Sequence, residues 1–553
     1  MPHDLQLSAL TMASYLYIAS SASLAVIVYA AFKLIEHRRF YANLPKPPGH
    51  SILFGHLKLF GDIVKLFPAG THPQYFYTYL SRKYSLPDVW YVDLWPIGPQ
   101  QVVITGPDAA AQVTAIRSYP MHPEVNRFLA PMIGDNVIAA TNGPLWKKLH
   151  HMMAPAFTPR YVKTLLSTIA DEVMLFHGRL RELAKAGDVF SMEEELSKLS
   201  FDVIGGIVFG VSFNAQRSGS LILDDLRAVL SLSQLIRESW NPITKIQAWW
   251  SRRQAIKRSD IFLQKRLVER YRVMKNEKNI PTRQSARSIL DRILLERIEN
   301  NGDAVEQPLG QDFLELAVNN LKALLIGGHG TTTDTLSFVY MMLGLHPEVL
   351  QRLRQEHDQV FAPSLTATRK ILQDNPAKTN ELEYTSAVIM ETLRIFPVGF
   401  SIRESPPNEP NLQFKSRSFP TAGQMIVLCQ HATHFDPKNY VEPSSFVPDR
   451  FLSSYDGPKP HRFAWRPFER GPRACMGQEL AMDEMRIILL MTVRWFDLEA
   501  VVRPESISKE PRVSYTDWDT KIGDLAFQEL KMGASPRNGM AMHAKMSGTA
   551  PSS

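Results

Sequence analysis

The chain has 553 residues, 44% of them hydrophobic and 21% charged, and a formal net charge of +7. This charge suits contact with anionic lipid headgroups or an acidic protein partner. It does not indicate a nucleic-acid binder, because no basic stripe with interleaved aromatic residues stands out. Only two cysteines are present, Cys429 and Cys475, which excludes a disulfide-stapled scaffold and fits a reducing compartment.

The N-terminal segment is apolar. No charged residue occurs from Leu5 to Phe32, and about 20 apolar residues suffice to cross a bilayer. A cleaved signal peptide is the alternative, but its apolar core is only about 7–15 residues long. We therefore expect a lumenal stub at residues 1–6 and a transmembrane anchor at residues 7–32. Basic residues follow the anchor, which predicts that the large domain faces the cytosol.

Residues 33–49 are basic and then proline-rich, ending in Leu44-Pro45-Lys46-Pro47-Pro48-Gly49. Such a stiff stretch cannot continue a helix and predicts a hinge between the anchor and the domain. Residues 50–530 contain neither an internal repeat nor a linker, which predicts one large, mainly helical domain. A smaller β region is indicated at residues 89–94 and 101–104. The polar residues 531–553 are expected to form a disordered tail.

Residues 311–345 contain no proline and carry apolar residues at helical spacing, which predicts one long helix. In its middle lie Gly327, Gly328 and Gly330, each costing about 1 kcal/mol of helix stability relative to alanine. A helix that accepts this cost is making room for something. The alternative is a weakened helix whose threonines bond their own backbone.

Glu391 and Arg394 are three residues apart on a predicted helix and can pair on one face. Phe396-Pro397 ends that helix directly afterwards. A solvated surface pair is the alternative interpretation.

The segment Phe468 to Gly477 surrounds Cys475 with Gly471 and Gly477. Its backbone can fold tightly and point N–H groups at the sulfur, and a predicted helix from Gln478 places a positive dipole end there. Both effects lower the pKa of a thiol. We interpret Cys475 as a metal-ligating thiolate, with a buried free cysteine as the alternative.

The pattern Phe-x-x-Gly-x-Arg-x-Cys-x-Gly resembles the haem-binding loop of the cytochrome P450 family, in particular its microsomal, fungal-type members. The resemblance implies the P450 fold, mainly α with a smaller β region in a single large domain, and haem b as cofactor with Cys475 as the axial iron ligand. It implies that haem also contacts Phe468, Gly477, Arg473, Trp146, His150 and Arg403. Trp146 and His150 stand where the family has a tryptophan and an arginine that bond the haem propionates.

The same resemblance assigns a structural role to Glu391 and Arg394, which would form a buried network with Arg450 from the segment Phe446 to Phe451. It places the hydroxyl of Thr331 beside dioxygen, with Thr332 next to it. Gly330 stands where the family carries an acid, so proton delivery stays open between ordered water, His329 and Asp334.

The implied activity is a monooxygenase that hydroxylates or epoxidises a hydrophobic small molecule with O2. Electrons would come from NADPH-cytochrome P450 reductase at the endoplasmic reticulum membrane. The motif details resemble fungal members that tailor polyketides or terpenoids. Two alternatives stay open: a haem-thiolate isomerase, dehydratase or peroxide-using enzyme of the same fold, and, more remotely, a membrane haem protein without turnover.

Overall fold

The computed structural model describes residues 2–276, 288–301, 309–503 and 513–548. The side chains of residues 2–16, 19, 276, 296 and 299–301 lie outside this description. The predicted lumenal stub, residues 1–6, therefore lies outside the described side chains.

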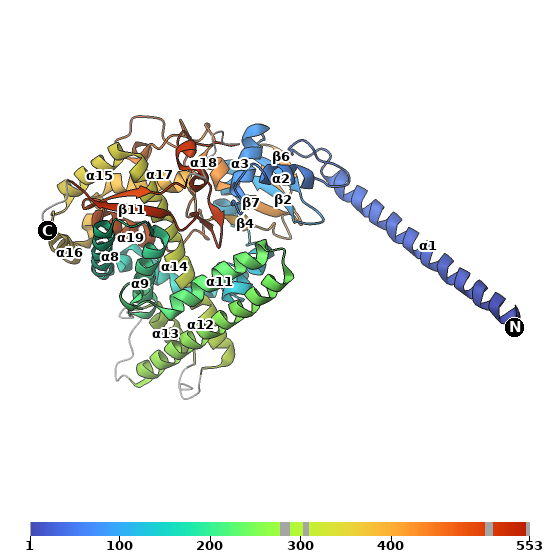
Figure 1. The fold of residues 1–553 in the computed structure, drawn as a ribbon, viewed down its shortest axis with the longest axis horizontal. Helices are drawn as coiled ribbons and strands as arrows, with labels where there is room; N and C mark the ends of the chain where they lie inside the picture. Colours follow the sequence, from blue (N-terminus) through green and yellow to red (C-terminus); the bar gives the residue numbers. More distant parts are fainter. Residues whose placement is uncertain (1, 277–287, 302–308, 504–512, 549–553) are drawn as a thin grey trace.

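Helices make up most of the chain (Figure 1). In chain order they are α1 (Pro2–Phe40), α2 (Leu57–Val64), α3 (Gln74–Lys83), α4 (Pro107–Ala111), α5 (Pro123–Ile133), α6 (Gly143–Met153), α7 (Pro159–Lys163), α8 (Leu166–Ala186), α9 (Met192–Phe209), α10 (Ala215–Ser218), α11 (Leu221–Glu238), α12 (Pro242–Asn276), α13 (Ile289–Asn301), α14 (Gln311–Leu345), α15 (Pro347–Val360), α16 (Leu365–Asp374), α17 (Glu383–Ile395), α18 (Gln430–His434), α19 (Gln478–Leu490) and α20 (Asp519–Ile522). The long helix predicted over residues 311–345 is confirmed as α14.

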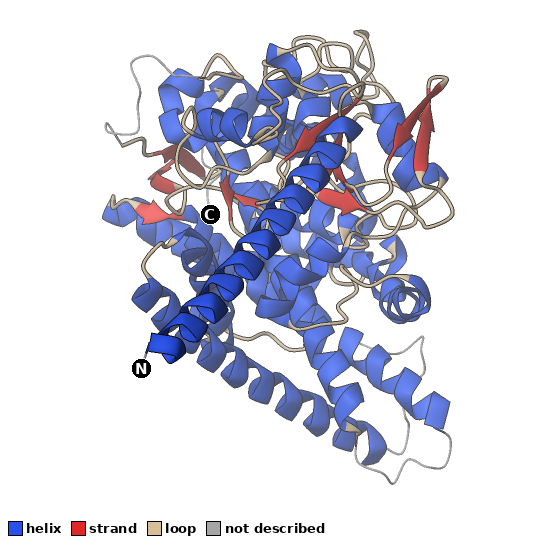
Figure 2. Cartoon of the chain, turned by 90° about the vertical axis from the view of Figure 1, so that its right-hand side faces the viewer, coloured by secondary structure: helices blue, strands red, loops and turns tan. Residues whose placement is uncertain are grey.

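The strands are short and lie in small sheets among the helices (Figure 2). They are β1 (Val89–Asp93), β2 (Gln100–Ile104), β3 (Phe190–Ser191), β4 (Ser401–Arg403), β5 (Asn411–Phe414), β6 (Arg417–Pro420), β7 (Met425–Leu428), β8 (Phe496–Ala500), β9 (Glu529–Leu530), β10 (Ala534–Ser535) and β11 (Ala541–Met546). The four-stranded sheet has the order β1-β2-β7-β4. Its first two strands are those predicted from the β-branched and aromatic runs, and they pair antiparallel with Val89 opposite Ile104.

The core elements that position the site are α14, α17 and α19. Helix α14 packs against α9, α17, α19 and β8, and residues from Leu336 to Leu343 are buried on all sides. A helix that is apolar all round belongs in the interior of a large domain. The Cys475 loop immediately precedes α19, so it is built against this central layer.

The C-terminal residues are not a disordered tail up to residue 548, which corrects the prediction for residues 531–553. β11 pairs with β8, with Met542 opposite Ala500 and Met546 opposite Phe496, and it also pairs with β3. Met540, Met542 and Ala544 are buried. The prediction was based on the overall polar composition of this segment, which gives no weight to its few apolar side chains. These side chains pack into the core where β11 completes the sheet with β3 and β8. Residues 549–553 lie outside the described part of the chain.

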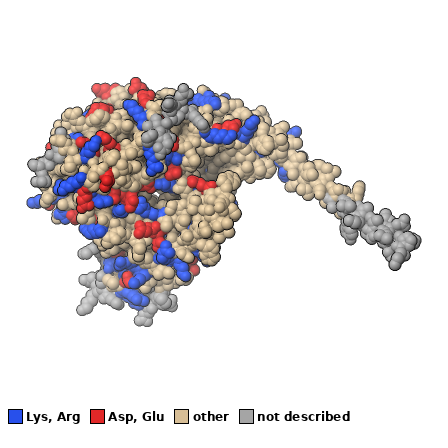
Figure 3. Space-filling model, viewed as in Figure 1, with Lys and Arg blue, Asp and Glu red and all other residues tan. Residues whose placement is uncertain are grey.

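Helix α1 extends away from the body of the molecule (Figure 1), and its described outer part carries few charged side chains (Figure 3). Residues 33–40, predicted as the start of a hinge, are the last turns of this helix. Among the residues that the structure describes, no helix is both long and apolar enough to cross a membrane. This finding does not support the transmembrane anchor predicted over residues 7–32, of which residues 7–16 have no described side chains.

Candidate functional site: the Cys475 loop and its surroundings

The Cys475 loop is held by its own backbone. The N–H of Cys475 donates to the carbonyl of Phe468 at 2.8 Å, and the N–H of Ala474 donates to Gly471 at 2.9 Å. Gly471 has φ +88°, and a Cβ there would lie 2.3 Å from the carbonyl oxygen of Thr114. Only glycine fits this position. Gly477 is the N-cap of α19, so the sulfur lies at the start of that helix as predicted.

The thiol of Cys475 behaves differently from the prediction. Its side chain is accessible, yet burial by the surrounding protein raises the pKa of the thiol, and a hydrogen bond from the Gly477 backbone only partly offsets this. An accessible side chain and a pKa raised by burial are compatible when the sulfur lies at a recess that the surrounding protein shields from bulk solvent. The predicted lowering of the pKa was wrong because desolvation outweighs the loop and the helix dipole. A metal that binds the sulfur would displace the proton.

Arg473, Trp146 and His150 lie together as predicted. Arg473 donates to the Thr141 carbonyl at 2.7 Å, and its guanidinium carbon lies 4.5 Å from the centre of the Trp146 ring. The rings of Trp146 and His150 on α6 are 5.1 Å apart between centroids. Stacking on an aromatic face fixes a guanidinium without neutralising its charge.

Arg403 on β4 adds a second cation to this cluster. Its side chain is 1% exposed and donates through Nη1 to the Tyr119 carbonyl at 3.2 Å, while its Nε has no hydrogen-bond partner among the described residues. Burial lowers the pKa of Arg403. Burial, with a contribution from Arg403, lowers the pKa of Arg473 to about 10.

Two neighbouring guanidinium groups with an unused buried donor form a site for an anion. The paired propionate carboxylates of haem have the charge and the acceptors that Arg403 and Arg473 lack, and the accessible sulfur of Cys475 belongs to a ligand type used by haem iron. The residues present therefore fit haem, with Phe468 and Gly477 contributed by the loop itself.

Glu391, Arg394 and Arg450 form the predicted network, and all three are buried. Arg394 grips Glu391 with two hydrogen bonds of 2.8 Å, and Arg450 Nε donates to Glu391 at 3.2 Å. The remaining donors of Arg394 reach backbone carbonyls of the segment 434–445, the shortest being to Pro443 at 2.7 Å. A fully bonded buried network of this kind fixes the geometry of the segments that it joins.

Sequence reasoning missed the residues that connect this network to the cysteine loop. His434 lies 2.9 Å through Nδ1 from the Arg394 carbonyl and accepts the N–H of Arg466 on Nε2 at 3.3 Å. Burial lowers the pKa of His434 to about 3, so the ring is neutral and both bonds are satisfied. Trp465 adds a bond to the Met390 carbonyl at 3.0 Å. The available sequence signal for this connection was the pair Trp465-Arg466, which comes just before Phe468.

The glycines of α14 divide into two kinds. A Cβ on Gly327 or Gly330 would meet nothing within 4 Å, whereas one on Gly328 would lie 2.6 Å from the side chain of Ile204 on α9. Thr331 is partly exposed on the open side. Its hydroxyl donates to the Gly327 carbonyl at 2.8 Å, and that of Thr332 to Gly328 at 3.2 Å. The helix is thus open beside Thr331, and both hydroxyls bond the backbone one turn earlier.

The two candidate substitutes for the acid at position 330 lie in other surroundings. His329 is buried against Phe201, with Nδ1 2.8 Å from the Leu325 carbonyl, and burial lowers its pKa to about 4. Asp334 accepts a hydrogen bond from Ser535 on β10 at 2.8 Å, and burial raises its pKa to about 8. His329 is therefore a neutral imidazole at physiological pH, whereas the Asp334 carboxyl changes its protonation state near that pH.

The model of the family "Cytochrome P450" matches residues 45–517 of the chain. Among curated relatives, the cytochrome P450 monooxygenase acrF of Aspergillus aculeatus is 33% identical over 500 residues, covering 86% of this chain and 98% of that protein. The cytochrome P450 monooxygenase polC of Polytolypa hystricis is 28% identical over 549 residues, covering 96% and 95%. The crystal structure of the cytochrome P450DA haem domain has the same fold, with a TM-score of 0.67 at 19% identity over 91% of this chain and 97% of that one. The chain therefore belongs to the cytochrome P450 family of haem-thiolate monooxygenases.

Proposed function

We propose that this monooxygenase hydroxylates or epoxidises a hydrophobic small molecule, with O2 as oxidant and electrons from NADPH-cytochrome P450 reductase. The proposed setting is fungal secondary metabolism, with a polyketide or a terpenoid as the substrate class. Support comes from the two similar monooxygenases, which are both proteins of fungi, and from the partly exposed apolar side chains of Ala323 and Leu324, about two turns before Thr331 on α14.

Haem b, bound through Cys475, would supply the activation of dioxygen and the insertion of one oxygen atom into the substrate. The protein's own residues hold and surround it. Arg403 and Arg473 would pair with the propionates, Trp146 holds the Arg473 guanidinium in place, and the Glu391 network keeps the loop rigid. The open side of α14 leaves room beside the Thr331 hydroxyl, which can exchange its bond to Gly327 for one to a water molecule.

The observation that carries the haem assignment is the buried Nε donor of Arg403, which has no partner in the described part of the chain and lies near Arg473 of the Cys475 loop. We expect purified protein, reduced and exposed to carbon monoxide, to show the red-shifted Soret band of a thiolate ligand. Cys475→Ser should lose that band. Arg403→Gln should keep the band but release haem faster to apomyoglobin. A Soret band at the ordinary imidazole position in the unmodified protein would refute the assignment.

A second candidate function rests on Gly330. Because no acid precedes Thr331, the chain could instead be a haem-thiolate isomerase, dehydratase or peroxide user that needs no proton relay for dioxygen. Reductase, NADPH and a panel of hydrophobic metabolites separate the two. A monooxygenase shows substrate-dependent NADPH consumption that falls on Thr331→Ala, whereas an isomerase turns over without NADPH and is insensitive to that substitution.

We also propose that α1 attaches the protein to the endoplasmic reticulum membrane, with the catalytic domain on the cytosolic side. Large apolar side chains of α1 are exposed, including Ile18, Leu24, Val26 and Phe32 at about 60% each, and basic residues follow at its last turn. Flotation with vesicles should retain the full chain and lose a chain that lacks residues 1–32. Equal flotation of both chains would refute the attachment by α1.

A further inference from the structure

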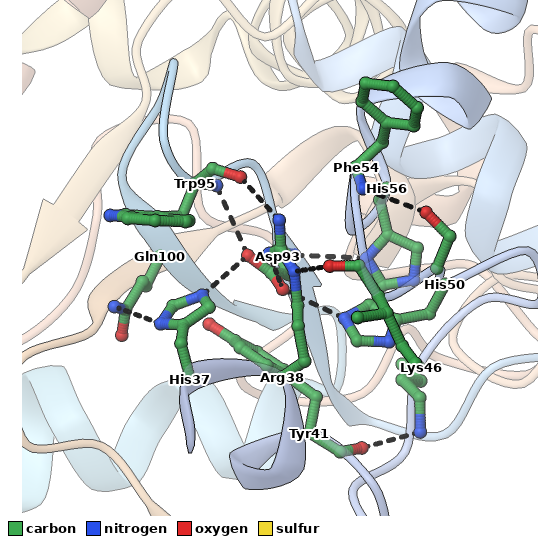
Figure 4. A network of polar contacts seen from close by, with 12 residues as sticks. His37, Arg38, Tyr41, Lys46, His50, Phe54, His56, Asp93, Trp95 and Gln100 are labelled. Carbon is green, nitrogen blue, oxygen red and sulfur yellow. Dashed lines mark hydrogen bonds and ion pairs between the residues drawn. The ribbon is translucent and has the colours of Figure 1, made fainter. Parts of the chain in front are cut away.

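A polar cluster outside the haem site joins α1 to the catalytic domain (Figure 4). Its centre is Asp93, the last residue of β1, whose side chain is fully buried. His37 donates to one carboxylate oxygen at 3.0 Å and the Trp95 N–H to the same oxygen at 3.2 Å. His50 donates to the other oxygen at 2.9 Å, and Arg38 pairs with it. We call His37, Arg38, His50 and Asp93 the Asp93 clasp.

The clasp links three segments that are separate in sequence. His37 and Arg38 come from the last turns of α1, His50 from the proline-rich stretch, and Asp93 from the main sheet. Burial alone would raise the pKa of Asp93, but hydrogen bonds from His50, His37 and Arg38 hold it well below its usual range. The carboxylate therefore stays charged and keeps all four of its donors.

Hydrogen bonds behind His37 fix its orientation. Gln424, directly before β7, donates to the Oε1 of Gln100 at 2.5 Å, and Gln100 on β2 donates to His37 Nδ1 at 3.2 Å. Because Nδ1 accepts, the ring proton is on Nε2 and points at Asp93. The last turns of α1 are thus bonded through His37 to two neighbouring strands, β1 and β2, and through Gln100 to the residue that precedes β7.

Arg38 fixes the chain on the other side of the carboxylate. It donates to the carbonyls of Ile52 at 3.0 Å and Trp95 at 2.9 Å. A Cβ on Gly55 would lie 2.7 Å from both Arg38 Nη1 and the Asp93 carbonyl, so this close approach requires glycine. Five donors in a fixed planar fork make arginine the side chain suited to such a joint.

The proline-rich stretch is also bonded to the domain. The N–H of Tyr91 donates to the Pro45 carbonyl at 2.8 Å, and Lys46 donates to the Tyr41 carbonyl at 2.6 Å. His56 accepts the Asp93 N–H at 3.0 Å and donates through Nε2 to the Pro47 carbonyl at 3.1 Å. The segment predicted as a hinge is therefore immobilised by bonds at both ends and in its middle.

We infer that the Asp93 clasp is a rigid joint that fixes the direction of α1 relative to the catalytic domain. When a membrane surface binds the apolar α1, the catalytic domain is then held at one fixed orientation to that surface. A flexible linker would instead allow the domain to take many orientations. The orientation is set inside the protein by one carboxylate and does not require contacts between the domain and that surface.

Spin labels on the full-length haem-loaded protein in detergent micelles test this joint. One label is placed on α1 at Val28→Cys and the other on β6 at Arg417→Cys, both at exposed positions. We expect a narrow distance distribution in the otherwise unmodified protein and at least a twofold broader one in Asp93→Asn. The carbon monoxide spectrum should be unchanged in both, because the clasp does not touch the haem site.

Asp88→Asn is the matched control, since Asp88 directly precedes β1 but pairs with the exposed Lys415 instead of with α1. It should leave the distribution narrow. If Asp93→Asn does not fold, His50→Ala replaces it in the test. This change removes one donor from the Asp93 oxygen that also pairs with Arg38, and it should broaden the distance distribution to a smaller degree. A broad distribution in the unmodified protein, or distributions in the folded clasp variants as narrow as in Asp88→Asn, would overturn the inference.

Discussion

Replacing Glu391 by glutamine should strongly destabilise the domain and release haem. The carboxylate receives two hydrogen bonds from Arg394, one from Arg450 and one from the Val447 N–H at 2.9 Å, and the two arginines are 0% and 3% exposed. Glutamine keeps the size but leaves two buried cations without a counter-charge and turns an NH2 group toward a guanidinium. Breaking a buried pair in this way costs about 3–5 kcal/mol, a large part of the roughly 5–15 kcal/mol that holds a domain folded.

The measurement is urea unfolding followed by circular dichroism, together with the ratio of haem to protein absorbance. Asp449→Asn is the control, because Asp449 is the sequence neighbour of Arg450 but pairs with Arg352 at the surface. The side chains of Asp449 and Arg352 are 37% and 47% exposed. That change should cost no more than about 1 kcal/mol. If Glu391→Gln unfolds at the same urea concentration as the control and retains its haem, the network does not hold the loop and our reasoning is wrong.

Gly328→Ala should destabilise the protein by about 1–3 kcal/mol through overpacking, because its Cβ would lie 2.6 Å from Ile204. Gly327→Ala meets nothing within 4 Å and should stabilise α14 by about 1 kcal/mol; urea unfolding of both variants measures the contrast, and shifts of the same sign would contradict it. The free energy of unfolding should pass through a maximum between about pH 6 and 7. Below this maximum, stability falls with falling pH because several buried histidines take up protons only on unfolding. Their folded pKa values are about 3–4, against an ordinary 6.5, and they are His56, His72, His329, His357 and His434. Above it, Asp334 and Glu484, whose folded pKa values are raised to about 8, lose protons on unfolding, so stability falls with rising pH. Glu484→Gln should flatten the alkaline side of this profile, and an unchanged slope there would argue against the raised pKa.

The features that sequence predicted well depend on neighbours along the chain. The helix over residues 311–345 follows from apolar spacing without proline, and the strands β1 and β2 from runs of β-branched and aromatic residues. The pairing of Glu391 with Arg394 follows from their spacing on one helical turn. The resemblance to the family supplied what spacing could not, namely that Arg450 joins the network of Glu391 and Arg394 and that the distant Arg403 belongs with Arg473.

The features that sequence missed depend on contacts between distant segments. The strand at residues 541–546 pairs with Phe496–Ala500, and no local pattern shows that partner. The hinge prediction rested on the prolines alone. It could not include the hydrogen bonds that the Pro45 and Pro47 carbonyls accept from Tyr91 and His56. The raised pKa of Cys475 is likewise a property of the folded surroundings, since only the packed protein supplies the desolvation that overrides the loop.

The cysteine and the two arginines together explain why folding and haem binding should be coupled in this chain. The buried Arg403 guanidinium beside Arg473 is unfavourable in the protein alone, because among the described residues its Nε has no hydrogen-bond partner that would compensate its desolvation. Haem would offset this cost, because its propionates would neutralise the two guanidinium groups, while Cys475 would bind the iron as a thiolate. A ligand that binds only the folded state stabilises it in proportion to its affinity. The Glu391 network, which is bonded through His434 to Arg466 just before the loop, would hold the loop in the shape that this binding requires.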